Sequence, residues 1–359
     1  MVFFAFHSPL DHRLINAFLI LNGVNTLLRV VSSYLDDKEV VSRSLLIFAL
    51  LAKSRHADSY IDLPITVDLC LHVAKNFPTT SSCILLALYL LQEIKSKEAL
   101  LRLDTESATF QTVLVRNQNS AEVCENVFMV IGIISQSSAV FRQQFLKSNG
   151  LKDVLDAISL YHNRPSIVIS ACGIFASLTS EAAFQQSAYR FTIIDLLNRW
   201  TFAATISDKL SPRIPMLETL QIILGVAASC ADHFIKRQGL MGIVILLDRS
   251  PDLETTVTCC RLVSSICSVT NASYSILATG IVSRICQAIQ TSVQPVVDFF
   301  CTIRLIAMQS LDCLQEVVNS HIAQTFVRYA QKSQDAQSVL EIMWTLSLLS
   351  TSCIGPRKG

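Results

Sequence analysis

One short pattern recurs along the chain at nearly equal intervals. An apolar stretch ends at a small or helix-breaking residue, and a second apolar stretch follows, most clearly from Phe145 to Ile158 around Gly150. The pattern recurs over residues 18–28, 234–247 and 276–285. The residues at the break, taken as anchors, are Gly23, Pro64, Asp104, Gly150, Arg190, Gly239, Gly280 and Ser320. Successive anchors lie 40 or 41 residues apart, with 46 and 49 at two places. A regular period of this length predicts one structural unit that repeats and stacks on its neighbours.

The composition indicates that the unit is helical. The chain has 10 Gly and 9 Pro among 359 residues, too few for the tight turns of a many-stranded β protein. A third stretch in each unit, such as residues 45–52, 128–134 and 342–349, is apolar almost all round and has to be covered on most sides. We therefore predict an all-α solenoid of about eight three-helix repeats. The anchor Gly is expected to take a positive φ angle and redirect the chain between two helices.

This three-helix pattern with a central Gly resembles the armadillo repeat, and the resemblance covers residues 18–350. HEAT repeats, usually built from two helices, are the near alternative. The resemblance implies a right-handed α-solenoid that forms one armadillo-like domain over residues 1–359, with a short tail at 353–359. The expected repeats are approximately 10–54, 55–96, 97–137, 138–180, 181–229, 230–268, 269–310 and 311–352.

The residues that grip peptides in well-known armadillo proteins are missing here. Those proteins carry an Asn on the third helix, often with a Trp one turn earlier. The aligned Asn positions read Leu51, Glu93, Ile134, Ser177, Val226, Ser265, Ala307 and Ser347. The aligned Trp positions read Ile47, Tyr89, Val130, Gly173, Ile222, Arg261, Ile303 and Met343. This departure argues against a nuclear-transport cargo adaptor and against an extended peptide held by its backbone.

The resemblance implies that the third helices line a concave face. The predicted partner-binding residues are Ile47, Leu51, Tyr89, Glu93, Val130, Ile134, Ile222, Val226, Arg261 and Ile303. Such an apolar groove suits an amphipathic helix. The alternative is an alignment that is off by one residue, in which case these side chains pack the core. A second candidate is the insertion between Arg190 and Gly239, where Pro212 and Pro215 predict a loop near Ser211.

The motifs of common enzymes and metal sites are not found. The chain has no Gly-rich phosphate loop, no Gly-x-Ser-x-Gly and no His-Glu-x-x-His. Cys230 and His233 form only a weak metal pair, because a structural zinc ion takes four ligands. Cys259 and Cys260 beside Arg261 are the one candidate for a reactive thiol, and core packing is favoured there too. We predict that the protein is not an enzyme and needs no cofactor or metal.

Charge and hydropathy narrow the partner class. The formal net charge is +1 and the basic residues are scattered, so nucleic acid is not an expected partner. The longest apolar runs are about half of the roughly 20 residues that span a membrane. The 12 cysteines include no Cys-x-x-Cys and indicate a reducing compartment, the cytoplasm or the nucleus.

The expected function is a scaffold or adaptor that binds a partner protein. The alternative is a structural subunit of a cytoskeletal, axonemal or other assembly. Apolar residues near both ends, such as Phe3 and Trp344, also predict self-association through the ends of the solenoid.

Overall fold

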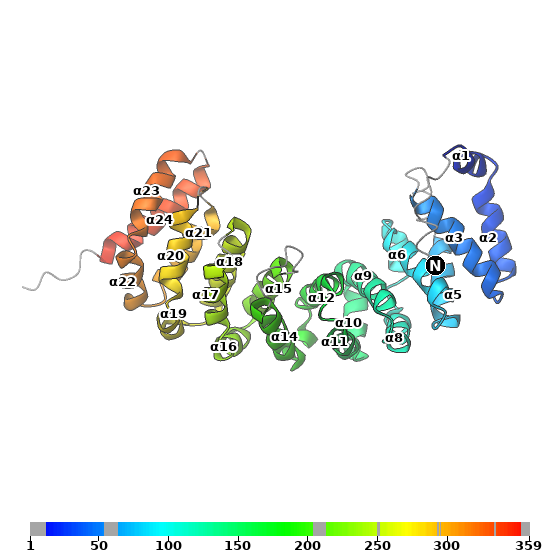
Figure 1. Ribbon diagram of the computed structural model, residues 1–359, viewed down its shortest axis with the longest axis horizontal. Helices are drawn as coiled ribbons and strands as arrows, with labels where there is room; N and C mark the ends of the chain where they lie inside the picture. Colours follow the sequence, from blue (N-terminus) through cyan, green and yellow to red (C-terminus); the bar gives the residue numbers. More distant parts are fainter. Residues whose placement is uncertain are drawn as a thin grey trace, which may run out of the picture. The chain divides into compact units, whose positions relative to one another are not determined.

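The structure is a computed structural model that describes residues 12–53, 64–203, 213–249, 252–292, 294, 296–333 and 335–352. The chain divides into two compact units, Met1–Ala183 and Phe184–Gly359 (Figure 1). Throughout these described ranges every regular element is an α-helix, as predicted. None of the described helices is long and apolar enough to cross a membrane.

The helices of the first unit come in groups of up to three. They are α1 (His12–Ile20), α2 (Gly23–Ser33) and α3 (Lys38–Lys53); α5 (Pro64–Asn76) and α6 (Ser81–Gln92); α7 (Lys97–Leu101), α8 (Ser107–Arg116) and α9 (Ala121–Ser137); and α10 (Ala139–Lys147), α11 (Gly150–Leu160) and α12 (Pro165–Leu178). The last helix of each group, here called the third helix, packs against the third helix of the next group, so α3, α6, α9 and α12 stack in order.

The second unit repeats this order. Its helices are α14 (Tyr189–Ala203) and α15 (Arg213–Val226), preceded by α13 (Ala182–Gln186), inside which the boundary between the units falls; α16 (Ala228–Lys236), α17 (Gly239–Arg249) and α18 (Leu253–Val269); α19 (Ser273–Thr279), α20 (Ile281–Thr291) and α21 (Val297–Ala307); and α22 (Leu311–Asn319), α23 (Ile322–Lys332) and α24 (Ala336–Ser352). The third helices α15, α18, α21 and α24 again pack in sequence (Figure 1). Their buried faces supply much of the core, including Phe299 and Phe300, which are fully buried.

The joints between first and second helices correct one prediction. A positive φ angle was expected at the anchor Gly, but at three joints it belongs to the preceding residue: Asn22 (59°), Asn149 (62°) and Gln238 (61°). Gly280 (67°) follows the prediction. Gly23, Gly150 and Gly239 instead begin the next helix.

Those three glycines are required by a phenylalanine five residues earlier. A Cβ atom at Gly23 would lie 2.5 Å from Cδ2 of Phe18, and one at Gly150 would lie 2.5 Å from Cδ2 of Phe145. A Cβ at Gly239 would overlap the ring of Phe234. The Gly therefore makes room for a ring, which is buried at Phe145 and Phe234 and half-buried at Phe18, since the positive φ angle is taken by its neighbour.

Polar side chains link each group to the one before it. The hydroxyl of Tyr161 donates to the carbonyl of Gln118 at 2.7 Å, and that of Tyr329 donates to the carbonyl of Ser292 at 2.7 Å. Asn117 Nδ2 donates to the carbonyl of Pro78 at 2.7 Å. Each accepting carbonyl belongs to a residue one or two positions beyond the C-terminal end of the preceding second helix, where the main chain is no longer helical. These bonds join residues that are 37 to 43 positions apart, close to one repeat period.

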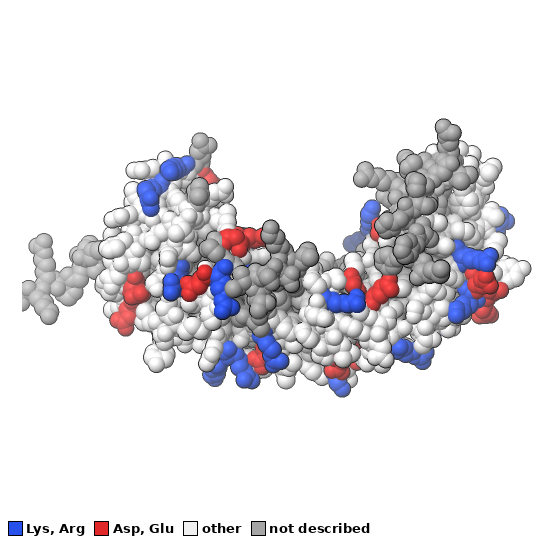
Figure 2. Space-filling model, viewed as in Figure 1, with Lys and Arg blue, Asp and Glu red and all other residues white. Residues whose placement is uncertain are grey.

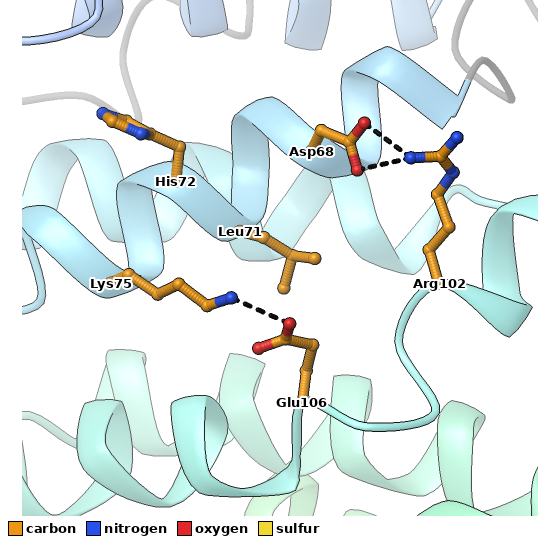
Figure 3. Close-up of a pocket in the computed structure, with 6 residues that line it drawn as sticks. All are labelled: Asp68, Leu71, His72, Lys75, Arg102 and Glu106. Atoms are coloured by element: carbon orange, nitrogen blue, oxygen red, sulfur yellow. Dashed lines mark hydrogen bonds and ion pairs between the residues drawn. The ribbon is translucent and has the colours of Figure 1, made fainter.

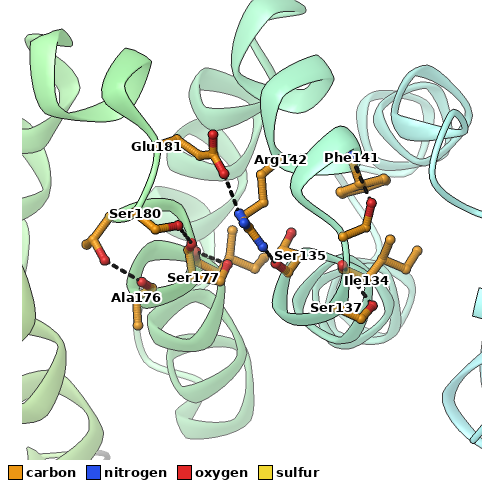
Figure 4. Close-up of polar contacts among 12 residues, drawn as sticks. Ile134, Ser135, Ser137, Phe141, Arg142, Ala176, Ser177, Ser180 and Glu181 are labelled. Carbon is orange, nitrogen blue, oxygen red and sulfur yellow. Dashed lines mark hydrogen bonds and ion pairs between the residues drawn. The ribbon is translucent and has the colours of Figure 1, made fainter. Parts of the chain in front are cut away.

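A mostly buried ion pair makes a similar link in the first unit (Figure 4). Arg142 on α10 donates from Nε to Oε1 of Glu181 at 2.7 Å and from Nη1 to the carbonyl of Ser135 on α9 at 2.8 Å. The two charged side chains are only 16% and 11% exposed. The guanidinium thus ties the end of α9 to the segment that follows α12.

Candidate protein-binding site

Four of the ten predicted binding residues lie in the core. Leu51, Val130, Ile134 and Ile303 are each at most 4% exposed, so a partner cannot reach them in this structure. For α9 and α21 the alignment was one residue off: Met129 and Arg304 lie on the accessible side, next to the buried Val130 and Ile303. The physical reason is that the third helices pack side by side, which leaves only a narrow exposed strip on each of them. The prediction of a continuous apolar groove is wrong at these positions.

The other six predicted residues are at least partly accessible. Ile222 and Arg261 are exposed and Val226 is half-buried, all in the second unit. Ile47 is exposed, and Tyr89 and Glu93 are half-buried, all in the first unit. A partner-binding role for these six residues stays a prediction.

In the second unit, three consecutive third helices form a groove of about 350 Å³. Its lining residues come from α15, α18 and α21 and are Gln221, Gly225, Arg261, Ser264, Ser265, Ser268, Val269, Asp298 and Cys301. Most of them carry a hydroxyl, amide or charged group. Polar side chains therefore outnumber apolar ones, but apolar atoms share the lining, so the groove is mixed in character and not the apolar groove that was predicted. Of the predicted residues it contains Arg261.

Ion pairs between adjacent third helices set the electrostatics of this surface. Arg261 Nη2 donates to Oδ2 of Asp298 at 2.9 Å, and this hydrogen bond raises the pKa of the Arg261 guanidinium. One helix further along, Arg304 Nη2 lies 3.1 Å from Oε2 of Glu341. The Arg304 guanidinium also lies over the Trp344 ring, 5.5 Å from its centroid. Each arginine is thus held in place by the next third helix.

The partners of these arginines were missed by sequence reasoning, although a signal was present. Asp298 follows Arg261 by 37 residues, and Glu341 follows Arg304 by 37 residues. That spacing is close to the repeat period, so opposite charges at this separation face each other on adjacent third helices. Gln221 and the groove serines carry no comparable pattern.

The cysteines behave as core residues. All eleven described cysteines are free thiols, and every one except the half-buried Cys301 is buried. Burial raises the pKa of Cys259 to about 12 and raises that of Cys260 well above its ordinary value. These thiols stay protonated at neutral pH, which favours core packing over a nucleophilic role. Burial, together with the negative charge of Glu341, also raises the pKa of Cys301.

The weak metal pair is not brought into a ligand cluster. His233 Nε2 lies 2.8 Å from Oδ1 of Asp195, which links α16 to α14. In the described ranges no three His, Cys, Asp or Glu residues lie close enough to hold a metal ion. Of the predicted loop, Ser211 and Pro212 lie outside the described residues, whereas Pro215 lies in the first turn of α15.

The first unit has a second hollow, of about 390 Å³, lined by Asp68, Leu71, His72, Lys75, Arg102 and Glu106 (Figure 3). Arg102 Nη1 donates to both carboxylate oxygens of Asp68, at 2.9 and 2.7 Å. Lys75 Nζ donates to Oε1 of Glu106 at 2.8 Å. Because these four charges form two ion pairs between α5 and the α7–α8 segment, the side chains that line the hollow hold these helices together.

Charge on the face shown in Figure 2 occurs in small groups, most of which mix both signs, separated by wide uncharged areas. No extended basic stripe crosses the described part of this face.

Comparisons with known proteins give the fold. No protein-family model and no curated protein match the sequence. Among solved structures, an engineered protein from the Northeast Structural Genomics Consortium aligns with a TM-score of 0.74 at 18% identity, over 94% of this chain and 80% of that chain. A second engineered protein from the same consortium aligns with a TM-score of 0.54 at 13% identity, over 72% of this chain and 100% of that chain.

A third solved structure gives a similar result. A chain solved in a study of a phosphorylation switch in the interaction between cadherin and β-catenin aligns with a TM-score of 0.66 at 11% identity. The alignment covers 92% of this chain and 62% of that one. At such low identity these similarities establish the fold alone: the protein is an armadillo-type α-solenoid.

Proposed function

We propose that the protein is a non-enzymatic scaffold or adaptor that binds a partner protein in the groove formed by α15, α18 and α21. The observation that carries the proposal is the groove itself, which crosses three consecutive third helices and is lined by polar side chains. Side chains such as Gln221 and Ser265 lie outside the core, since both remain partly exposed. A row of hydrogen-bonding groups beside an arginine supplies the directional contacts that give an interface its specificity.

Apolar side chains near the groove support the same proposal. Ile222 on α15 is 43% exposed, and Trp344 on α24 is 52% exposed. Tryptophan and arginine are enriched among the residues that dominate binding energy at protein interfaces. The Arg304–Trp344 stack holds both side chains in one orientation, which reduces the entropy lost when a partner binds.

The experiment compares two charge reversals in the tagged full-length protein. Arg261→Glu changes the groove, and Arg249→Glu changes an exposed arginine at the end of α17, away from the groove residues. Proteins that co-purify with the wild type are identified by mass spectrometry. We expect at least one of them to be lost with Arg261→Glu and retained with Arg249→Glu. Identical sets for all three proteins would refute the groove as the binding site.

The half-buried Cys301 provides a direct measure of occupancy. It lies in the groove, whereas every other described cysteine is buried. In a Cys353→Ser background, the rate at which Cys301 is alkylated should fall when the partner is added. A raised pKa makes this reaction slow at neutral pH, so the assay belongs at pH 8.5 or above, estimated from the ordinary thiol pKa of about 9.

One observation favours a second candidate, a structural subunit of a larger assembly. Leu340, Met343 and Trp344 on α24 are each more than half exposed. Exposed apolar groups of this size commonly mark contact surfaces. A stable complex of fixed stoichiometry that is lost with Met343→Ser and retained with Arg261→Glu would support assembly through α24 over binding in the groove.

A further inference from the structure

One side of α9 in the first unit remains accessible along its whole length. The side chains of Glu122, Glu125, Met129, Ile133 and Gln136 are all partly or fully exposed. Their spacing of three or four residues places them on one helical face. The buried residues between them, such as Val127, Phe128 and Ile131, face the core.

The neighbouring third helices extend this surface on both sides. Gln92 Nε2 at the end of α6 donates to Oδ1 of Asn126 on α9 at 2.9 Å, which brings Glu93 beside α9. On the other side, a Cβ at Gly173 of α12 would lie 3.9 Å from Nε2 of Gln136. We call the surface made by Glu93, Glu122, Glu125, Met129 and Ile169 the acidic face.

Within the described ranges, no basic side chain pairs with the carboxylates of this face. Helices α6, α9 and α12 contain no Lys or Arg at all. No ion pair links Glu93, Glu122 or Glu125 to a basic side chain of the described residues. Arg164, which precedes α12, is the nearest basic residue along that helix and forms no such pair either. In the second unit, by contrast, Asp298 and Glu341 each pair with an arginine on the adjacent third helix.

Apolar side chains accompany the carboxylates. Met129 is 40% exposed and Ile169 on α12 is 46% exposed, although both helices are otherwise well packed. An unpaired negative charge beside exposed apolar atoms matches a ligand that combines Lys or Arg with apolar side chains. Charge attracts such a ligand and sets its orientation, and apolar burial then contributes to affinity.

The amide groups on this surface favour a helical ligand. An extended peptide needs side chains that can bond to its backbone. Here Gln92 already donates to Asn126, and Asn126 Nδ2 donates to the carbonyl of Glu122 at 2.8 Å. A helix satisfies its own backbone and needs only side-chain contacts. We propose that the acidic face binds an amphipathic helix of a partner protein, with Lys or Arg residues flanking its apolar stripe.

The test uses three synthetic peptides of about 18 residues and the full-length protein. The first has leucines at helical spacing flanked by lysines. The second replaces the lysines with glutamates, and the third keeps the lysines but carries two central prolines that prevent a helix. Binding is measured by fluorescence anisotropy at about 0.05 and 0.3 M salt, because surface charge interactions weaken as salt rises.

Two double variants of the protein distinguish binding at the acidic face from an effect of the protein's overall charge. E122Q/E125Q removes two charges from the face, whereas E98Q/E254Q removes two exposed carboxylates elsewhere. We expect the lysine peptide to bind and its affinity to fall about tenfold with E122Q/E125Q, roughly 1.4 kcal/mol. E98Q/E254Q should change it less than twofold, and the glutamate peptide should not bind. Met129→Ser should weaken binding even at the higher salt concentration.

Three outcomes would overturn the proposal. Equal losses with both double variants would show that only the net charge of the protein matters. Equal binding of the proline peptide would show that the ligand is extended. An unchanged affinity with Met129→Ser would show that the apolar side chains take no part. Because Arg261 lies in the other unit, loss of binding with Arg261→Glu alone would instead assign the peptide to the groove of the second unit.

Discussion

At the scale of single residues, the joints show how one position dictates another. At three joints, a residue with a positive φ angle is followed by Gly. A phenylalanine lies five positions before that Gly, as in the Phe145–Gly150 pair. After Gly280 and His321, which have φ angles of 67° and 57°, the next residue is isoleucine. Five positions before that isoleucine, the residue is Ile276 at the first joint and Val317 at the second. The joint therefore accepts either a ring with a glycine or two aliphatic side chains, because the space between the helices is fixed.

Gly150→Ala should destabilise the protein. The new methyl group would lie 2.5 Å from Cδ2 of Phe145 and 2.6 Å from Nε2 of Gln111, and the buried ring has little room to move. We expect a loss of about 1–3 kcal/mol, typical of overpacking. Gly173→Ala is the matched control, because its nearest neighbour outside the helix would be 3.9 Å away and Ala favours a helix. Urea unfolding followed by circular dichroism measures both, and equal stability of the two variants would contradict the steric explanation.

The buried thiols should make stability fall at high pH. Burial raises the pKa of Cys267 to about 12 and that of Cys286 to about 11, whereas in the unfolded chain they ionise near 9. Above pH 9 the unfolded state loses protons that the folded state keeps, so the free energy of unfolding decreases by up to about 1.4 kcal/mol per thiol per pH unit. Below pH 8 these groups should have no effect. Urea midpoints at pH 7.5, 9 and 10 under reducing conditions test this.

The control for this pH dependence removes one titrating group. Cys267→Ala should be less stable than the wild type at pH 7.5, because it leaves a small cavity, but its stability should fall less steeply between pH 9 and 10. Parallel pH curves for the two proteins would assign the loss of stability to other groups.

At the scale of elements, the sequence was enough to predict the repeat period and the all-α fold class. It was not enough to predict which strip of each helix is exposed. Regular anchors such as Gly150 and Gly239 report the spacing of the units directly. The exposed strip depends on how each helix is rotated between its neighbours, and one residue of error turns a helix by about 100°. That rotation decides whether Val130 or Met129 faces outward. Leu51 and Ile134 were misplaced for the same reason, because aliphatic residues surround both faces of these helices.

The Arg142–Glu181 pair should be an essential link between elements. Arg142→Met would leave the Glu181 carboxylate mostly buried without its partner, at a cost of about 3 kcal/mol. The double variant R142M/E181L removes both charges and should recover much of this loss. The exposed pair of Arg43 and Glu39 on α3 is the control, and Arg43→Met should cost less than about 0.5 kcal/mol. Thermal unfolding of the wild type and the three variants measures these losses, and a double variant no more stable than R142M would argue against this role of the pair.

At the scale of the whole molecule, the stability of a solenoid is carried by contacts between neighbouring repeats. The chain divides at residues 183 and 184 into two units, each with its own stack of third helices. A defect in one unit should therefore be felt mainly inside that unit. Gly150→Ala and Gly239→Ala introduce the same clash between a methyl group and a phenylalanine ring in the first and second unit, respectively.

Amide hydrogen exchange in mild urea can test this division directly. With Gly150→Ala, we expect helices α8 to α12 to lose protection while α18 to α24 keep that of the wild type. Gly239→Ala should give the reverse, with faster exchange in α16 to α20. The two variants serve as controls for each other, because the chemical change is identical. Uniform loss of protection across both units in either variant would mean that the chain unfolds as one cooperative body, and the acidic face and the groove could then not be perturbed independently.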